Sequence, residues 1–69
     1  MSAQARAARL YPRSVGFRSA YVHGAAAAEA GRTESTCPYA RESAKTWRSA
    51  FRAAWMRGHA SVTVTRGES

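Results

Sequence analysis

The sequence predicts an all-α protein in which two helices are joined by a structured connection at Cys37-Pro38-Tyr39, with flexible N- and C-terminal tails. Apolar residues recur at three- and four-residue steps over residues 13–28 and again over residues 41–57, which is the spacing of one helix face. Pro38 requires an extended backbone at the residue before it, so the two helices cannot be continuous. At 69 residues, the chain has room for one small domain.

The first helix is predicted over residues 13–28. Its apolar face is formed by small and aromatic residues: Phe17, Ala20, Tyr21, Gly24, Ala27 and Ala28. Gly16 and Gly24 each lower helix propensity by about 1 kcal/mol relative to alanine, but small residues on an apolar face let another backbone come close. Gly31 is expected to end this helix, because glycine readily adopts the left-handed conformation of a helix C-terminus.

The second helix is predicted from about residue 41 to Arg57, with Gly58 as its stop. Ala44, Trp47, Phe51, Ala54 and Trp55 form an aromatic stripe, and a second stripe is basic: Arg41, Lys45, Arg48 and Arg52. At about 100° per residue the two stripes lie roughly a quarter-turn apart. The aromatic residues are expected to pack against the first helix rather than to stack on bases, since the chain offers few other large apolar groups.

The ends of the chain are expected to be flexible. Residues 1–12 form a basic lead-in that is at most transiently helical over residues 3–10 and is interrupted by Pro12. Residues 59–69 have strand-like alternation over only four positions without a visible partner strand, which predicts a disordered tail. The predicted domain is therefore residues 13–58.

The charge of the chain indicates a polyanionic partner. Formal net charge is +7, from 11 Lys and Arg against 4 Asp and Glu, and arginine binds phosphate bidentately and stacks on bases. The alternatives are an anionic membrane surface and a helix face that is merely solvated. No apolar run is long enough to span a bilayer, and a cytoplasmic location is expected. A nucleic acid is the first candidate for the polyanionic partner. The predicted RNA contacts are Arg13, Arg18, Arg32, Tyr39, Arg41, Lys45, Arg48 and Arg52.

Cys37 is the only cysteine, so an intramolecular disulfide is excluded. A zinc site needs three or four Cys and His ligands at short spacing, whereas His23 and His59 are isolated in the sequence. A catalytic thiolate needs a nearby base, and nothing in the sequence pairs Cys37 with either histidine. Cys37 is expected to be a small buried apolar residue in the connection. No metal or cofactor is predicted, no small-molecule substrate is expected, and an enzyme is the weaker interpretation.

The motifs resemble those of the ribosome modulation factor family. The run AYVHGAAAAEAGRTESTCPY (residues 20–39) is similar to the family's glycine-bearing helix followed by Gly-Arg and Cys-Pro-Tyr. WRSAFRAA (residues 47–54) is similar to its tryptophan-containing second helix. The positions matched to the family are Gly31, Arg32, Cys37, Pro38, Tyr39 and Trp47. The residues predicted to be structural are Gly24, Gly31, Cys37, Pro38, Trp47, Phe51 and Trp55.

The resemblance implies a two-helix protein that binds the small subunit of the bacterial ribosome near the 3′ end of its rRNA, represses translation in stationary phase or stress, and promotes inactive ribosome dimers. It also implies that Arg32 and Tyr39 contact RNA. A branch of similar proteins is described as fluoroquinolone-modifying phosphotransferases, which is the alternative from the enzyme class. A module that binds DNA or a partner protein through the same basic face is a third interpretation.

Overall fold

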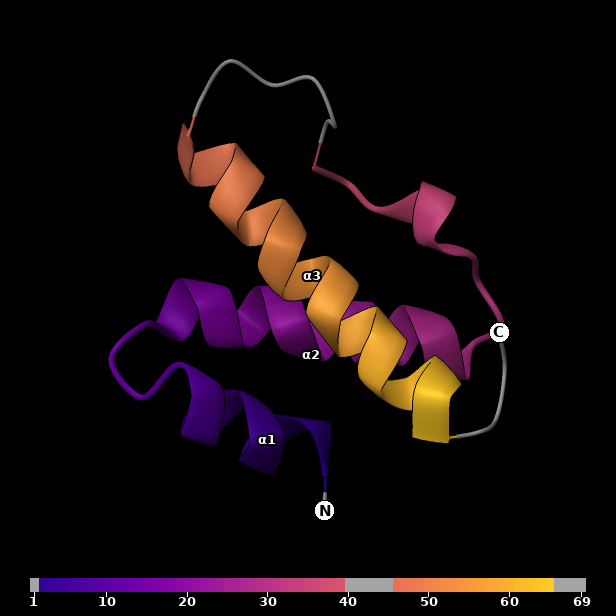
Figure 1. The fold of residues 1–69 in the computed structure, drawn as a ribbon, viewed down its shortest axis with the longest axis horizontal. Helices are drawn as coiled ribbons and strands as arrows, with labels where there is room; N and C mark the ends of the chain where they lie inside the picture. Colours follow the sequence, from indigo (N-terminus) through magenta and orange to yellow (C-terminus); the bar gives the residue numbers. More distant parts are fainter. Residues whose placement is uncertain (1, 40–45, 66–69) are drawn as a thin grey trace.

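The computed structural model describes residues 2–39 and 46–65, and the side chains of residues 2–39 and 49–65. These residues form three α-helices, α1 (Ala3–Leu10), α2 (Val15–Glu29) and α3 (Thr46–Thr65), and one 3-10 turn, η1 (Glu34–Thr36), without a strand (Figure 1). The all-α prediction is confirmed. The predicted number of helices was two, and the described residues contain a third, α1.

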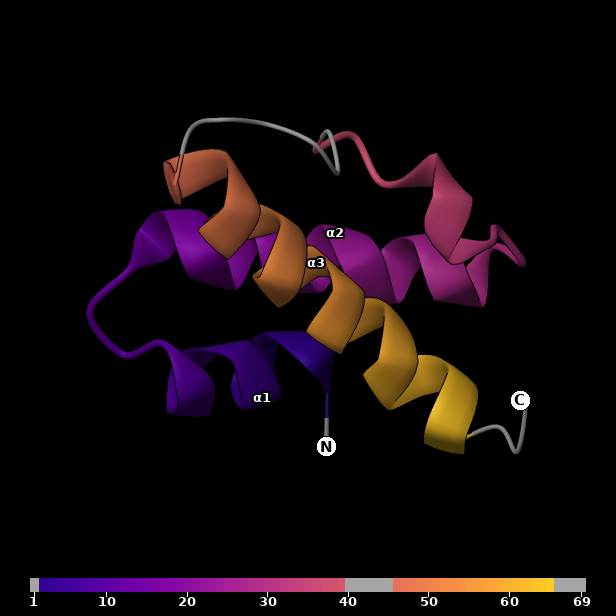
Figure 2. The same ribbon diagram turned by 45° about the horizontal axis from the view of Figure 1, so that its top comes forward.

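Both N-terminal helices begin at a serine. The Ser2 side chain accepts a hydrogen bond from the Ala5 amide at the start of α1, and the Ser14 side chain accepts one from the Phe17 amide at the start of α2. A serine in this position satisfies one of the amide groups that have no partner inside the helix. The turn at Pro12 and Arg13 separates the two helices and lets α1 fold back beside α2 (Figure 2).

α2 ends at a glycine, as the sequence predicts. Gly31 has a φ of 79°. Its amide donates to the Ala28 carbonyl, and the Arg32 amide donates to the Ala27 carbonyl. This pair of bonds is the Schellman motif, which satisfies the last carbonyls of a helix and turns the chain away from the helix axis. The chain then enters the connection at Arg32.

The N-terminal segment is an ordered, packed helix, so the prediction of a flexible lead-in over residues 1–12 is wrong for its described part. Ala7 has 0% exposure. The Arg6 guanidinium donates to the Tyr21 hydroxyl at 3.2 Å and to the Ser61 hydroxyl at 3.5 Å. An isolated helix of eight residues is marginal in water, so these contacts with α2 and α3 are what stabilise α1.

α3 passes through Gly58 and continues to Thr65. The prediction of a helix stop at Gly58 and of a disordered tail is therefore wrong for residues 59–65, and residues 66–69 lie outside the described part. Val62 is buried. The hydroxyls of Ser61, Thr63 and Thr65 donate to carbonyls three or four residues earlier. Burial of one face thus outweighs the low helix propensity of the Ser-Val-Thr-Val-Thr sequence.

α3 crosses α2 (Figure 1), and one glycine of each helix lies at the contact. A Cβ on Gly24 would overlap the Trp55 carbonyl oxygen, and a Cβ on Gly58 would overlap the Tyr21 carbonyl oxygen. Each glycine therefore lies directly against the backbone of the opposite helix. The expectation that a small residue at position 24 lets another backbone come close is confirmed.

The core beside this crossing consists mainly of small residues. Five of the eight buried apolar residues in the described part are alanines, and Tyr21 and Trp55 are its aromatic members. Phe17 and Phe51 pack against it with their ring centroids 4.9 Å apart. The prediction that Phe51 and Trp55 belong to the core is confirmed. The side chain of Trp47, the third predicted core aromatic, lies outside the described residues.

We predict that Gly24→Ala destabilises the protein strongly. Overpacking a close contact typically costs 1–3 kcal/mol, and the gain in helix propensity offsets only about 1 kcal/mol of it. Because the new Cβ meets backbone rather than a movable side chain, we expect a net loss of roughly 2 kcal/mol. The free energy of unfolding can be measured by urea denaturation followed by circular dichroism.

Ser19→Ala provides the control for this variant, because Ser19 is an exposed residue of the same helix. We expect its free energy of unfolding to equal or slightly exceed that of the wild type. A Gly24→Ala protein as stable as Ser19→Ala would show that the helices do not meet at this glycine.

Candidate nucleic-acid interface

Arg32 lies at the corner where the chain leaves α2. It follows Gly31 and is exposed. Its side chain borders a cavity beside α2, while its backbone contacts α3. The left-handed conformation of Gly31 thus determines where this arginine is placed. The sequence pair Gly-Arg can therefore be explained physically as a helix stop followed by a presented cation.

His59 fixes the corner to α3. Its Nε2 is 2.7 Å from the Arg32 carbonyl oxygen. A carbonyl can only accept, so Nε2 carries the hydrogen and donates it. The His59 ring is 8% exposed and stacks on the Trp55 indole, with a centroid distance of 5.3 Å and an interplanar angle of 18°. One side chain therefore joins the connection to the core of the α2–α3 pair.

Cys37 and Tyr39 also attach the connection to the core. Cys37 is a half-buried free thiol that packs against the cluster around Ala20, Ala54 and Trp55. The Tyr39 ring stacks on Phe51 at 5.7 Å between centroids and is half-buried. Cys-Pro-Tyr is thus a structural corner. The described residues contain no group of three His, Cys, Asp or Glu side chains placed to hold a metal ion.

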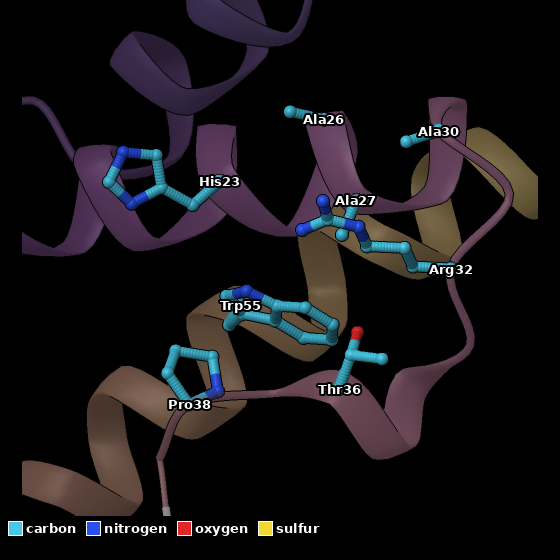
Figure 3. Close-up of a pocket in the computed structure, with 8 residues that line it drawn as sticks. All are labelled: His23, Ala26, Ala27, Ala30, Arg32, Thr36, Pro38 and Trp55. Carbon is cyan, nitrogen blue, oxygen red and sulfur yellow. The ribbon is translucent and has the colours of Figure 1, made fainter.

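A cavity of about 490 Å³ opens between α2, the connection and α3 (Figure 3). Its α2 wall consists of Ala26, Ala27 and Ala30, and Trp55 of α3 also borders it. The polar groups that border it come from two segments, His23 from α2 and Arg32 with Thr36 from the connection. None of the described acidic residues lines the cavity.

The other predicted basic contacts are spread over the fold. Arg13 is exposed in the turn before α2, and Arg52 is half-buried on α3. Arg18 is half-buried beside α1, and within the described part of the chain its Nε is a buried nitrogen with no hydrogen-bond partner. Arg41, Lys45 and the side chain of Arg48 lie outside the described residues. The basic stripe predicted for the second helix therefore stays a prediction.

The cavity brings together Arg32 and Pro38 of the connection and Trp55 of α3. Ala27 and the exposed His23 of α2 also border it. The sequence predicts no role for His23, and it predicts a disordered tail at His59. The one sequence signal for His59 is its spacing of four from Trp55, which places the two rings on one helix face. That signal is usable only if the helix is known to continue past Gly58.

No family model, no curated protein and no solved structure matched the chain. Within the described residues, no helix combines the length and the apolar character needed to cross a membrane.

We predict that His59→Phe loosens the connection while keeping the packing of α3. Phenylalanine can stack on Trp55 but cannot donate to the Arg32 carbonyl. Loss of such a bond typically costs about 1 kcal/mol, so the segment after Gly31 should open more often. Limited trypsin digestion followed by mass spectrometry measures this opening as cleavage after Arg32, which should be several-fold faster than in the wild type.

Cleavage after Arg13 is the internal control, since this exposed arginine lies in the turn before α2 and has no contact with His59 in the structure. Its rate should not change. Equal acceleration at both sites would indicate global destabilisation, and no acceleration at Arg32 would mean that the hydrogen bond does not hold the corner.

Proposed function

We propose that this protein binds the rRNA of the small subunit of the bacterial ribosome and inactivates ribosomes without catalysing a reaction. The observation that carries the proposal is the corner at Arg32. There an exposed arginine borders a cavity that, among the residues the structure describes, has no acidic lining. The resemblance of residues 20–39 and 47–54 to the ribosome modulation factor family supports the choice of partner.

The charge distribution supports a polyanion as the partner. In residues 2–39 and 49–65 there are seven arginines and two glutamates, Glu29 and Glu34. Arginines on several segments can contact successive phosphates of a strand, and each contact releases counterions from the nucleic acid. Such contacts give affinity and a steep salt dependence, whereas base contacts give specificity.

RNA is favoured over duplex DNA by the form of the surface. Recognition of duplex DNA commonly uses a helix inserted in the major groove. Here the concave surface lies at the side of the α2–α3 pair and is bordered by a short connection. Single-stranded RNA is read by aromatic and arginine side chains in such concave places. Competition between duplex DNA and small-subunit rRNA separates the two alternatives.

Co-sedimentation with bacterial ribosomes on a sucrose gradient tests the proposal. The protein should migrate with the small subunit at low salt and be released as the salt concentration rises. A ribosome dimer peak would add the mechanism of inactivation. Protein that stays at the top of the gradient at both salt concentrations would contradict the proposal. Drug-dependent ATP consumption by the pure protein would instead support the phosphotransferase alternative.

We predict that Arg52→Ala weakens rRNA binding and lowers its salt dependence. Loss of one phosphate contact should reduce the slope of log affinity against log salt concentration by about 0.7–1. Fluorescence anisotropy with a labelled small-subunit rRNA fragment at several salt concentrations measures both quantities. The affinity loss should be similar for rRNA fragments of different sequence, because phosphates carry no sequence information.

Arg9→Ala is the charge-matched control, because Arg9 is an exposed arginine of α1 and is not among the predicted contacts. Both variants lower the net charge by one. The slope should be closer to the wild-type value for Arg9→Ala. Identical slopes for the two variants would mean that only net charge matters and that Arg52 makes no specific contact.

A further inference from the structure

The cavity at the corner combines an apolar wall with groups that bind anions. Alanines of α2 supply most of the apolar part, because the bordering Trp55 is only 3% exposed, and Arg32 supplies the nitrogen donors. In Figure 3 the Arg32 side chain runs back from the connection toward Ala27, so its guanidinium lies within the cavity region. A matching ligand carries a flat, weakly polar ring next to a negative group.

The size of the cavity also fits such a ligand. Cavities of roughly 300–1,000 Å³ hold drug-sized molecules, and this one measures about 490 Å³. A nucleotide has the required shape and chemistry: a base that prefers apolar or aromatic neighbours and a phosphate that binds a guanidinium bidentately. The described lining residues include no carboxylate that would repel the phosphate.

We propose that this cavity takes one unpaired nucleotide of an RNA strand, with its base against the alanine wall of α2 and its phosphate on Arg32. The inference rests on the proposed function and names the chemical form in which the RNA is recognised. Arg32 would then contact both the phosphate and the edge of the base.

An unpaired nucleotide within a strand fits better than a free nucleotide. Among the described residues, the basic side chains that border the cavity are Arg32 and His23, which is little for holding a lone phosphate. A strand adds contacts between its neighbouring phosphates and other arginines, and these raise the effective concentration of the nucleotide at the cavity. A base inside a duplex must first be unstacked and unpaired, which opposes its entry.

The fluorescence of Trp55 tests occupancy directly. Trp47→Phe leaves Trp55 as the only tryptophan, and this protein is titrated with three probes: a single-stranded RNA hexamer, a blunt-ended RNA duplex without unpaired nucleotides, and adenosine 5′-monophosphate. The hexamer should change Trp55 emission with saturation. The duplex should leave Trp55 emission nearly unchanged, because its bases are paired and stacked. Adenosine 5′-monophosphate that binds as tightly as the hexamer would overturn the assignment to a strand.

A variant that fills the cavity without changing charge separates this inference from the proposed function. Ala26→Leu adds bulk to the cavity wall at an exposed helix position. It should weaken hexamer binding several-fold, because the base can no longer lie against the alanine wall. Ala53→Leu is the matched control, since Ala53 is an exposed alanine of α3 that does not line the cavity, and it should bind as the wild type does.

Arg32→Lys is a second variant that keeps the charge and loses the planar, bidentate group. It should weaken hexamer binding several-fold while the salt slope stays near the wild-type value. Wild-type hexamer affinity in both Ala26→Leu and Arg32→Lys would overturn the cavity site. It would not contradict the proposed binding to the ribosome, which co-sedimentation tests separately. Failure of the unmodified protein to bind any RNA would overturn both proposals.

Discussion

The close contact between α2 and α3 at Gly24 and Gly58 is the constraint on which the rest of the structure depends. The contact is reciprocal, because each glycine lies against the carbonyl of an aromatic residue three positions before the other glycine, Trp55 or Tyr21. Most of the buried apolar residues described are alanines, and alanine side chains cannot fill a wide gap between helices. The two aromatic side chains are therefore covered only if the backbones come this close.

The crossing also explains how distant segments meet. Because α3 continues past Gly58, His59 reaches the Arg32 carbonyl, and Ser61 reaches Arg6 of α1. The first contact fixes the corner that bears the exposed arginine, and the second holds α1 against the α2–α3 pair. The cavity lies where the corner, α2 and Trp55 meet, so its shape is a consequence of the same crossing. The proposed RNA site thus depends on the fold rather than on a flexible basic segment.

Much of the α2 region could be predicted from the sequence, because its signals are local. The apolar periodicity gives the helix, Gly31 gives its end, and Pro38 gives the extended corner. The docking of α1 could not be predicted, because Arg6 and Ala7 are stabilised by residues far along the chain. The continuation of α3 was missed because Gly58 was treated as a helix stop, although YVHG (residues 21–24) and WMRG (residues 55–58) share an aromatic-x-x-glycine pattern. That recurrence indicates a paired crossing, in which glycine is needed for close approach rather than for a turn.

Glycine therefore has two roles in this fold. Gly31 ends a helix in the left-handed conformation, and Gly24 and Gly58 let two backbones come into contact. The Arg32 corner depends on both roles. The central claim is that this corner recognises unpaired rRNA of the small subunit. Hydroxyl-radical and base-specific chemical footprinting of isolated small subunits, with and without the protein, tests it most directly. We expect protection of a short single-stranded rRNA segment, with at least one base protected as well as the backbone. The base protection should be lost in Arg32→Lys. Protection confined to duplex backbone, or no protection at saturating protein, would contradict it.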